Sequence, residues 1–134
     1  MTTDATAPAL VPDPANVEAL LERLASDLGA ALVCAATAIG HRLGLFRALA
    51  RGGPQTPREV AERTGIEERH AREWLCGQAA RGYVIYDPNA ATFALSPEQA
   101  ACLADEESPT YIGGALQWLH AYAGAAASRP ATSA

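Results

Sequence analysis

Between Thr56 and Gly82 the apolar positions follow helical spacing in two stretches separated by a glycine. The segment Thr56–Glu59 has the order of a capping box, in which the threonine hydroxyl and the glutamate each bind a backbone N–H. The first helix is predicted to end at Gly65, because glycine adopts the left-handed conformation without strain. The second is predicted from about Glu67 to Arg81, where apolar residues recur every three or four positions.

Two short β-rich segments follow these helices. Tyr83–Tyr86 and Thr92–Leu95 predict strands, and the turn-forming residues 87–91 between them predict a hairpin. Helix, tight turn, helix and small hairpin are the elements of a winged helix-turn-helix. The pattern therefore predicts a mainly α fold with a small β-hairpin wing.

The amino-terminal part of the chain predicts a long helix that starts at the capping pair Asp13-Pro14. Its apolar seam has heptad-like spacing, and Leu20, Leu32 and Ile39 widen it. A domain of this size is too small to cover such a seam, so we expect a homodimer through this helix; the alternative is a core helix within the monomer. The seam consists of Val17, Leu21, Leu24, Leu28, Ala31 and Ala35.

Three more helices are expected outside the central pattern. One covers Gly40 to Ala50, one starts at the capping residue Ser96, and a C-terminal helix is predicted to start at Ser108-Pro109. We expect residues 1–12 and 124–134 to be disordered because they are rich in Ala, Thr and Pro. Residues 13–123 then form one winged-helix dimerisation domain.

Charge gives little support for a nucleic-acid partner. The 134 residues carry a net charge of −5, and the basic part, His41 to Gly82, reaches only +3 from eight arginines and five glutamates. A DNA-binding domain is usually strongly basic. We therefore do not expect nucleic acid as a partner.

The sequence offers no catalytic or metal-binding constellation. His41, His70 and His120 are far apart and lack cysteine or carboxylate partners at ligand spacing. The three cysteines show no Cys-x-x-Cys pair, which is typical of reduced thiols in a cytoplasmic protein. We therefore expect no metal. The longest apolar run, residues 30–39, is too short to span a bilayer, so no membrane is expected either.

Five motifs, taken together, resemble the N-terminal winged-helix domain of bacterial class I S-adenosylmethionine-dependent methyltransferases. The resemblance covers roughly residues 17 to 122. It implies a domain that dimerises and covers the substrate pocket, while a separate C-terminal Rossmann-like domain binds the cofactor. The motifs are Ile39–Leu49, Thr56–Gly65, Arg72–Leu75, Gly82–Val84 and Ser108–Gly114.

The chain departs from that family where the cofactor would bind. It has no glycine-rich turn after a first strand, and Gly113-Gly114 lies within a helical pattern. We therefore expect no cofactor in this chain and S-adenosylmethionine only where a catalytic domain is supplied elsewhere. Whether the chain is an enzyme stays open. His41 stands where relatives usually carry an acidic residue.

The resemblance also implies that the last helix faces the substrate. Its candidate substrate-facing residues are Tyr111, Trp118, His120 and Tyr122. The alternative is that Trp118 and Tyr122, four positions apart, pack against each other on one helix.

A small winged-helix transcriptional regulator is the alternative function. Its second helix would then place Arg69 and Arg72 in a major groove. Glu67 and Glu68 precede them at the same end, where carboxylates repel phosphates and suit the positive end of the helix dipole. The sequence therefore favours the methyltransferase-like dimerisation and substrate-lid domain.

Overall fold

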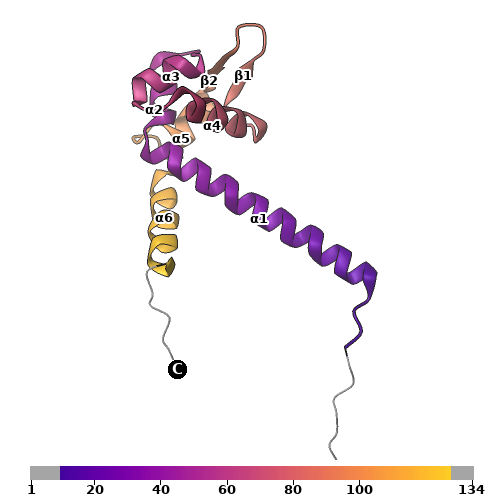
Figure 1. Ribbon diagram of the computed structural model, residues 1–134. Helices are drawn as coiled ribbons and strands as arrows, with labels where there is room; N and C mark the ends of the chain where they lie inside the picture. Colours follow the sequence, from indigo (N-terminus) through magenta and orange to yellow (C-terminus); the bar gives the residue numbers. More distant parts are fainter. Residues whose placement is uncertain (1–9, 128–134) are drawn as a thin grey trace, which may run out of the picture. The chain divides into compact units, whose positions relative to one another are not determined.

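The structure is a computed structural model that describes residues 10–127, and these form six helices and one two-stranded antiparallel sheet (Figure 1). The chain divides into two compact units, residues 1–31 and 32–134. Helix α1 (Pro14–Arg42) belongs in part to each. Most of the segments predicted to be disordered, 1–9 and 128–134, lie outside the described residues.

Helix α1 begins where the capping pair predicts. The Asp13 carboxylate accepts a hydrogen bond from the Ala15 N–H at 2.9 Å, satisfying one of the free donors of the first turn. The predicted break at Gly40 is wrong, because the helix continues to Arg42. The chain turns instead at Gly44, whose φ of +74° needs a glycine, and α2 (Leu45–Gly52) follows.

The two helices of the helix-turn-helix are confirmed. Helix α3 (Pro57–Thr64) has the complete capping box: Glu59 N–H donates to the Thr56 hydroxyl at 3.3 Å, and Thr56 N–H donates to the Glu59 carboxylate at 2.7 Å. Gly65 ends the helix at φ +74°, and α4 (Glu68–Ala80) follows. The sequence predicted both helices because their start and stop signals are local.

The wing is also confirmed, with shorter strands than predicted. Strands β1 (Ile85–Asp87) and β2 (Thr92–Ala94) pair antiparallel, with Tyr86 opposite Phe93. Gln55 adds an isolated bridge to Phe93, with its N–H donating at 2.9 Å and its carbonyl accepting at 2.8 Å. The segment before α3 is thereby tied to the wing.

The core lies between α2, α3, α4 and the wing. Its largest fully buried side chains come from α2. Phe46 meets the Trp74 ring edge to face, with centroids 4.9 Å apart, an arrangement that aromatic pairs favour. The core cluster comprises Leu45, Phe46, Leu49, Val60, Leu75, Val84, Phe93 and Leu103.

Side chains of α4 hold the carboxyl-terminal part of α1. The Trp74 indole N–H donates to the Ala36 carbonyl at 2.8 Å, and a methyl group on Gly40 would overlap the same indole ring. The buried Gln78 amide accepts from the Thr37 hydroxyl at 3.3 Å. These contacts fix the end of α1 on the winged helix.

Two helices follow the wing. Helix α5 (Pro97–Leu103) has the predicted capping box at Ser96. The last helix, α6 (Gly113–Ala127), begins later than predicted, because residues 108–111 form a turn in which Tyr111 N–H donates to the Ser108 carbonyl at 3.1 Å. Ser108-Pro109 therefore does not cap a helix. At its other end α6 passes Gly124, where the apolar pattern ends.

Candidate functional site

The apolar seam of α1 is uncovered in the single chain. All six seam residues are exposed, and Leu28 keeps 66% of its surface accessible. The neighbouring Leu20 and Leu32 are exposed as well. Because isolated apolar side chains are common on surfaces but long apolar stripes are not, this face is a candidate contact surface. Its occupant stays a prediction.

By length and composition, α1 also meets the test for a helix that could cross a membrane. Its apolar 18-residue window has a mean hydropathy of 1.4, with 17% of that window buried. The apolar run of residues 30–39, which is too short to span a bilayer, does not reveal this property of the whole helix. The same test is passed by core helices of soluble proteins and by signal sequences, so on its own it is weak support for a membrane span.

Two of the predicted substrate-facing residues form a pair on the surface of α6. The Trp118 and Tyr122 rings stack with centroids 5.5 Å apart and an interplanar angle of 18°. The alternative expectation, that they pack against each other, is therefore confirmed. Both rings remain more than 60% exposed, so the pair also presents an apolar patch.

The other two predicted residues contact the end of α1. The Tyr111 hydroxyl lies 2.5 Å from His41 Nε2, and His120 Nε2 lies 2.9 Å from Arg42 Nη1. Because a guanidinium only donates, His120 accepts in this contact. Burial, followed by the charge of Glu106, raises the pKa of Tyr111, while Arg47 lowers it. The sequence could not reveal these pairs, whose members are 70 and 78 residues apart.

An apolar hollow of about 440 Å³ lies where α5, α6 and the carboxyl-terminal part of α1 meet. None of the four predicted substrate-facing residues lines it. The signal that could have found it is the pair Ile112 and Leu116, four positions apart at the start of the last helix. Its lining residues are Cys34, Thr37, Tyr83, Glu98, Gln99, Cys102, Leu103, Ile112 and Leu116.

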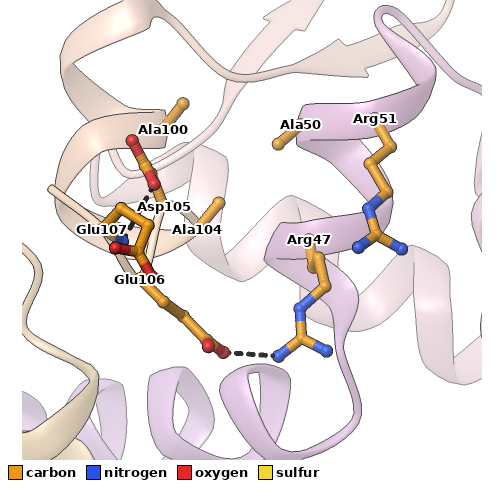
Figure 2. A pocket seen from close by; sticks show the side chains of 8 residues that line it. All are labelled: Arg47, Ala50, Arg51, Ala100, Ala104, Asp105, Glu106 and Glu107. Atoms are coloured by element: carbon orange, nitrogen blue, oxygen red, sulfur yellow. Dashed lines mark hydrogen bonds and ion pairs between the residues drawn. The ribbon is translucent and has the colours of Figure 1, made fainter.

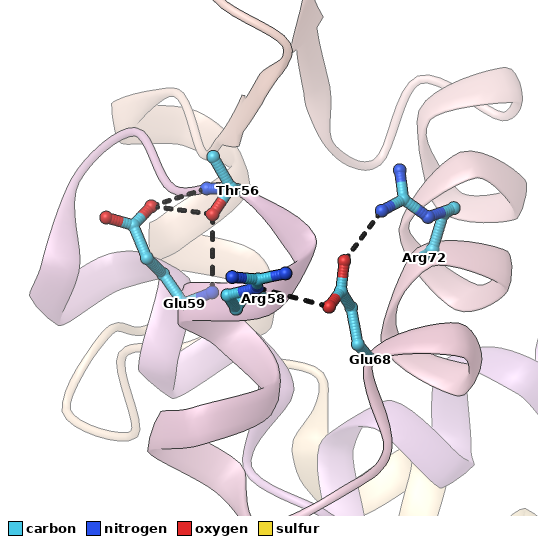
Figure 3. Close-up of polar contacts among 5 residues, drawn as sticks. All are labelled: Thr56, Arg58, Glu59, Glu68 and Arg72. Carbon is cyan, nitrogen blue, oxygen red and sulfur yellow. Dashed lines mark hydrogen bonds and ion pairs between the residues drawn. The ribbon is translucent and has the colours of Figure 1, made fainter.

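The arginines predicted as possible DNA contacts are already paired. Arg72 donates to the Glu68 carboxylate at 2.8 Å, and Arg58 reaches the other Glu68 oxygen at 3.3 Å (Figure 3). Arg69 pairs with Glu73 at 3.0 Å. These contacts are exposed and individually weak, yet they place a carboxylate beside each guanidinium that would approach a phosphate.

A second charged surface lies between α2 and the loop after α5. Arg47 donates to the Glu106 carboxylate at 2.9 Å, and Arg51, one turn further along α2, has no such contact in Figure 2. Arg47 and Arg51 line a hollow at this surface, and Asp105 and Glu107 line it as well. Nowhere in residues 10–127 do three or more His, Cys, Asp or Glu side chains gather as a metal site would require.

A sequence model of the Rv2258c-like winged HTH domain matches residues 30–105. The match covers more than half of the chain, so this protein belongs to the Rv2258c-like winged HTH domain family. None of the curated proteins matches it at a significant level.

Several solved structures that this chain resembles are those of methyltransferases. The chain is similar to PigF with SAH at 18% identity and a TM-score of 0.67, covering 75% of this chain and 29% of that one. It is similar to the mitomycin 7-O-methyltransferase MmcR at 26% identity and a TM-score of 0.64, covering 79% and 30%. It also resembles an O-methyltransferase family protein from Burkholderia thailandensis at 20% identity and a TM-score of 0.58, covering 87% and 31%.

The chain thus spans about 30% of the length of the solved structures that it matches. It is a winged-helix domain of the kind found in the N-terminal region of S-adenosylmethionine-dependent O-methyltransferases, as its sequence motifs imply. The only sheet in residues 10–127 is the two-stranded wing, so this part of the chain contains no Rossmann-type catalytic domain.

Proposed function

We propose that this chain acts as the dimerisation and substrate-covering domain of an S-adenosylmethionine-dependent O-methyltransferase. The observation that carries the proposal is the exposed apolar seam of α1, from Val17 to Ala35, on a winged-helix domain that resembles part of the mitomycin 7-O-methyltransferase MmcR. A second copy of the chain is the simplest partner for this seam, because in an isologous dimer the seams of the two copies cover each other.

The chemistry of methyl transfer would come from a catalytic domain on another polypeptide or on another part of the same protein. Within this proposal, the winged-helix domain would hold two such domains together and close over their substrates. The uncharged surface of α6, with Trp118 and Tyr122, supports a role in covering an apolar methyl acceptor, because aromatic rings provide large contact areas.

Light scattering on the purified chain tests the dimer. We expect the mass of two chains at micromolar concentration, because an obligate interface keeps its partner at that dilution. A stable monomer would contradict the dimer and with it the proposed function. The covering role is tested separately by adding a class I catalytic domain and measuring methyl transfer, where we expect activity only when both polypeptides are present.

A further inference from the structure

Three arginines line one hollow at the ends of two helices. Arg47 and Arg51 lie one turn apart on α2, and Arg63 lies in the last turn of α3. The hollow has a volume of about 340 Å³ and contains no aspartate or glutamate among its lining residues. The remaining lining residues are Leu43, Gly44, Ala48 and Thr64.

The charge of this group is largely unpaired. Within residues 10–127 neither Arg51 nor Arg63 takes part in an ion pair, whereas Arg58, Arg69 and Arg72 all do. Arg47 gives one nitrogen to Glu106 on its other side (Figure 2), which leaves its remaining N–H groups available.

Glu59, the acidic residue four positions before Arg63 on α3, is held by another group. Hydrogen bonds from Thr56 are the main causes that lower the pKa of Glu59, and the charge of Arg63 is the smallest. The Thr64 hydroxyl donates to the Val60 carbonyl at 2.7 Å, so it has no proton left for a ligand. The side-chain donors available in the hollow are therefore the arginines.

Helix electrostatics explain part of this arrangement. Arg51 and Arg63 each lie in the last turn of a helix, where a cation balances the carbonyl end of the dipole. That effect accounts for each arginine separately. It does not require both side chains to line the same hollow, together with Arg47 and without a carboxylate.

We infer that this hollow binds a phosphate-type dianion. Planar guanidinium groups form paired N–H···O bonds with tetrahedral oxyanions, and two unpaired arginines match a charge of −2. Arg51 and Arg63 are the principal donors, and Arg47 supplies a third guanidinium at the edge shared with Glu106. The anion is either free or the headgroup of a phospholipid, which share this chemistry.

Titration of the full chain with inorganic phosphate, at constant ionic strength and against nitrate, tests the site. The readout is the NMR signal of each arginine Nε–H. We expect saturable shifts of Arg47, Arg51 and Arg63 with phosphate and none with nitrate. Uniform shifts with both salts would mean general screening and would overturn the inference.

Variants distinguish this hollow from other arginines. Arg51→Gln and Arg63→Gln should each weaken phosphate binding about two- to fivefold, the usual range for an exposed ionic contact. Arg81→Gln is the matched control, because Arg81 is also exposed, makes no ion pair within residues 10–127 and lies outside the hollow. Equal weakening by Arg81→Gln would contradict the site.

Two further ligands identify the source of the anion. Vesicles of phosphatidylcholine with added phosphatidic acid should bind, with dependence on Arg51 and Arg63, only if the source is a headgroup; free phosphate binding alone assigns a soluble anion. Either result supports the site. Duplex DNA that binds through these arginines while phosphate does not bind would overturn it. Circular dichroism of each variant confirms that it is folded.

Discussion

At the scale of single residues, Gly40 determines how α1 approaches α4. Its missing side chain lets the Trp74 ring lie against the helix backbone, where a methyl group would overlap the ring. We expect Gly40→Ala to lower the free energy of unfolding by about 1–3 kcal/mol, the usual cost of overpacking. Urea unfolding measures this change.

Gly77 provides the control within α4. A Cβ there meets no atom within 4 Å, and the position lies inside the helix on an exposed face. Gly77→Ala should therefore raise the free energy of unfolding by about 0.5–1 kcal/mol through helix propensity. If Gly40→Ala also raises the free energy of unfolding, close packing against Trp74 does not explain the glycine at position 40.

The contact between Tyr111 and His41 predicts a dependence on alkaline pH. Burial raises the folded-state pKa of Tyr111 above its ordinary value of 10.0, so the neutral phenol stabilises the folded state. This contribution is complete below pH 10 and is lost as the pH rises through the raised pKa. At pH 8 we expect the free energy of unfolding of the wild type to exceed that of Tyr111→Phe by about 1 kcal/mol, the typical contribution of one hydrogen bond.

The difference between the two proteins should decrease above pH 10, because Phe cannot ionise and the wild-type phenol does. Thermal unfolding of both proteins from pH 8 to pH 11 gives this comparison directly. A constant difference over that range would mean that Tyr111 ionisation is not linked to folding.

Residues were predictable from sequence where their partners are close in the chain. Thr56 and Glu59 are three positions apart, and their capping box has one simple geometry. His41 and Arg42 contact residues that lie 70 and 78 positions further along the chain, and no local sequence pattern encodes such contacts. The arginine hollow was likewise not recognisable, because it depends on how α2 and α3 pack.

At the scale of elements, the uncovered seam of α1 makes the sharpest prediction. Leu28→Asp places a charge in the centre of the apolar face, and burying an unpaired carboxylate against a second copy is strongly unfavourable. We expect this variant to be monomeric or unfolded in light scattering and circular dichroism at micromolar concentration.

Ser26→Asp is the matched control for the seam. Ser26 lies two residues before Leu28, about 200° around the helix, and is also exposed. The same charge should therefore leave the dimer intact. Dissociation of both variants would point to a general effect of negative charge on α1 rather than to a seam.

Element boundaries show where local signals are insufficient. The sequence placed a break at Gly40, but Trp74 requires that glycine inside a continuous helix, and the actual break is at Gly44. Likewise, Ser108-Pro109 has the sequence of a helix start, but the Ile112 N–H donates to the Cys102 carbonyl at 3.0 Å, and α6 begins only at Gly113. In both places a tertiary contact decides between two candidate glycines or caps.

At the scale of the whole molecule, the chain should bind S-adenosylmethionine no better than a protein without a cofactor site. The strands of its described part are the two of the wing, and no helix there starts after a parallel strand with a glycine-rich turn. Calorimetric titration should show no saturable heat. A micromolar dissociation constant would contradict this prediction.

The winged-helix fold also raises the question of duplex DNA, and the charge arrangement on α4 answers against strong binding. Glu68 contacts both Arg58 and Arg72, and Glu73 contacts Arg69, so each guanidinium near the expected groove-facing end carries a carboxylate partner. With a net charge of −5, the chain also repels DNA at a distance. We expect weak or undetectable binding in fluorescence anisotropy at about 150 mM salt.

Substitution of Glu68 tests this explanation directly. Glu68→Gln removes one carboxylate and leaves Arg58 and Arg72 unpaired, so the variant should bind DNA non-specifically with higher affinity than the wild type. This affinity should decrease steeply with added salt, because each phosphate contact releases counterions. Glu62→Gln changes the net charge equally but removes no ion pair within residues 10–127, and should have a smaller effect. Nanomolar, sequence-dependent binding by the wild-type chain, abolished by Arg69→Ala or Arg72→Ala, would instead establish a DNA-binding regulator.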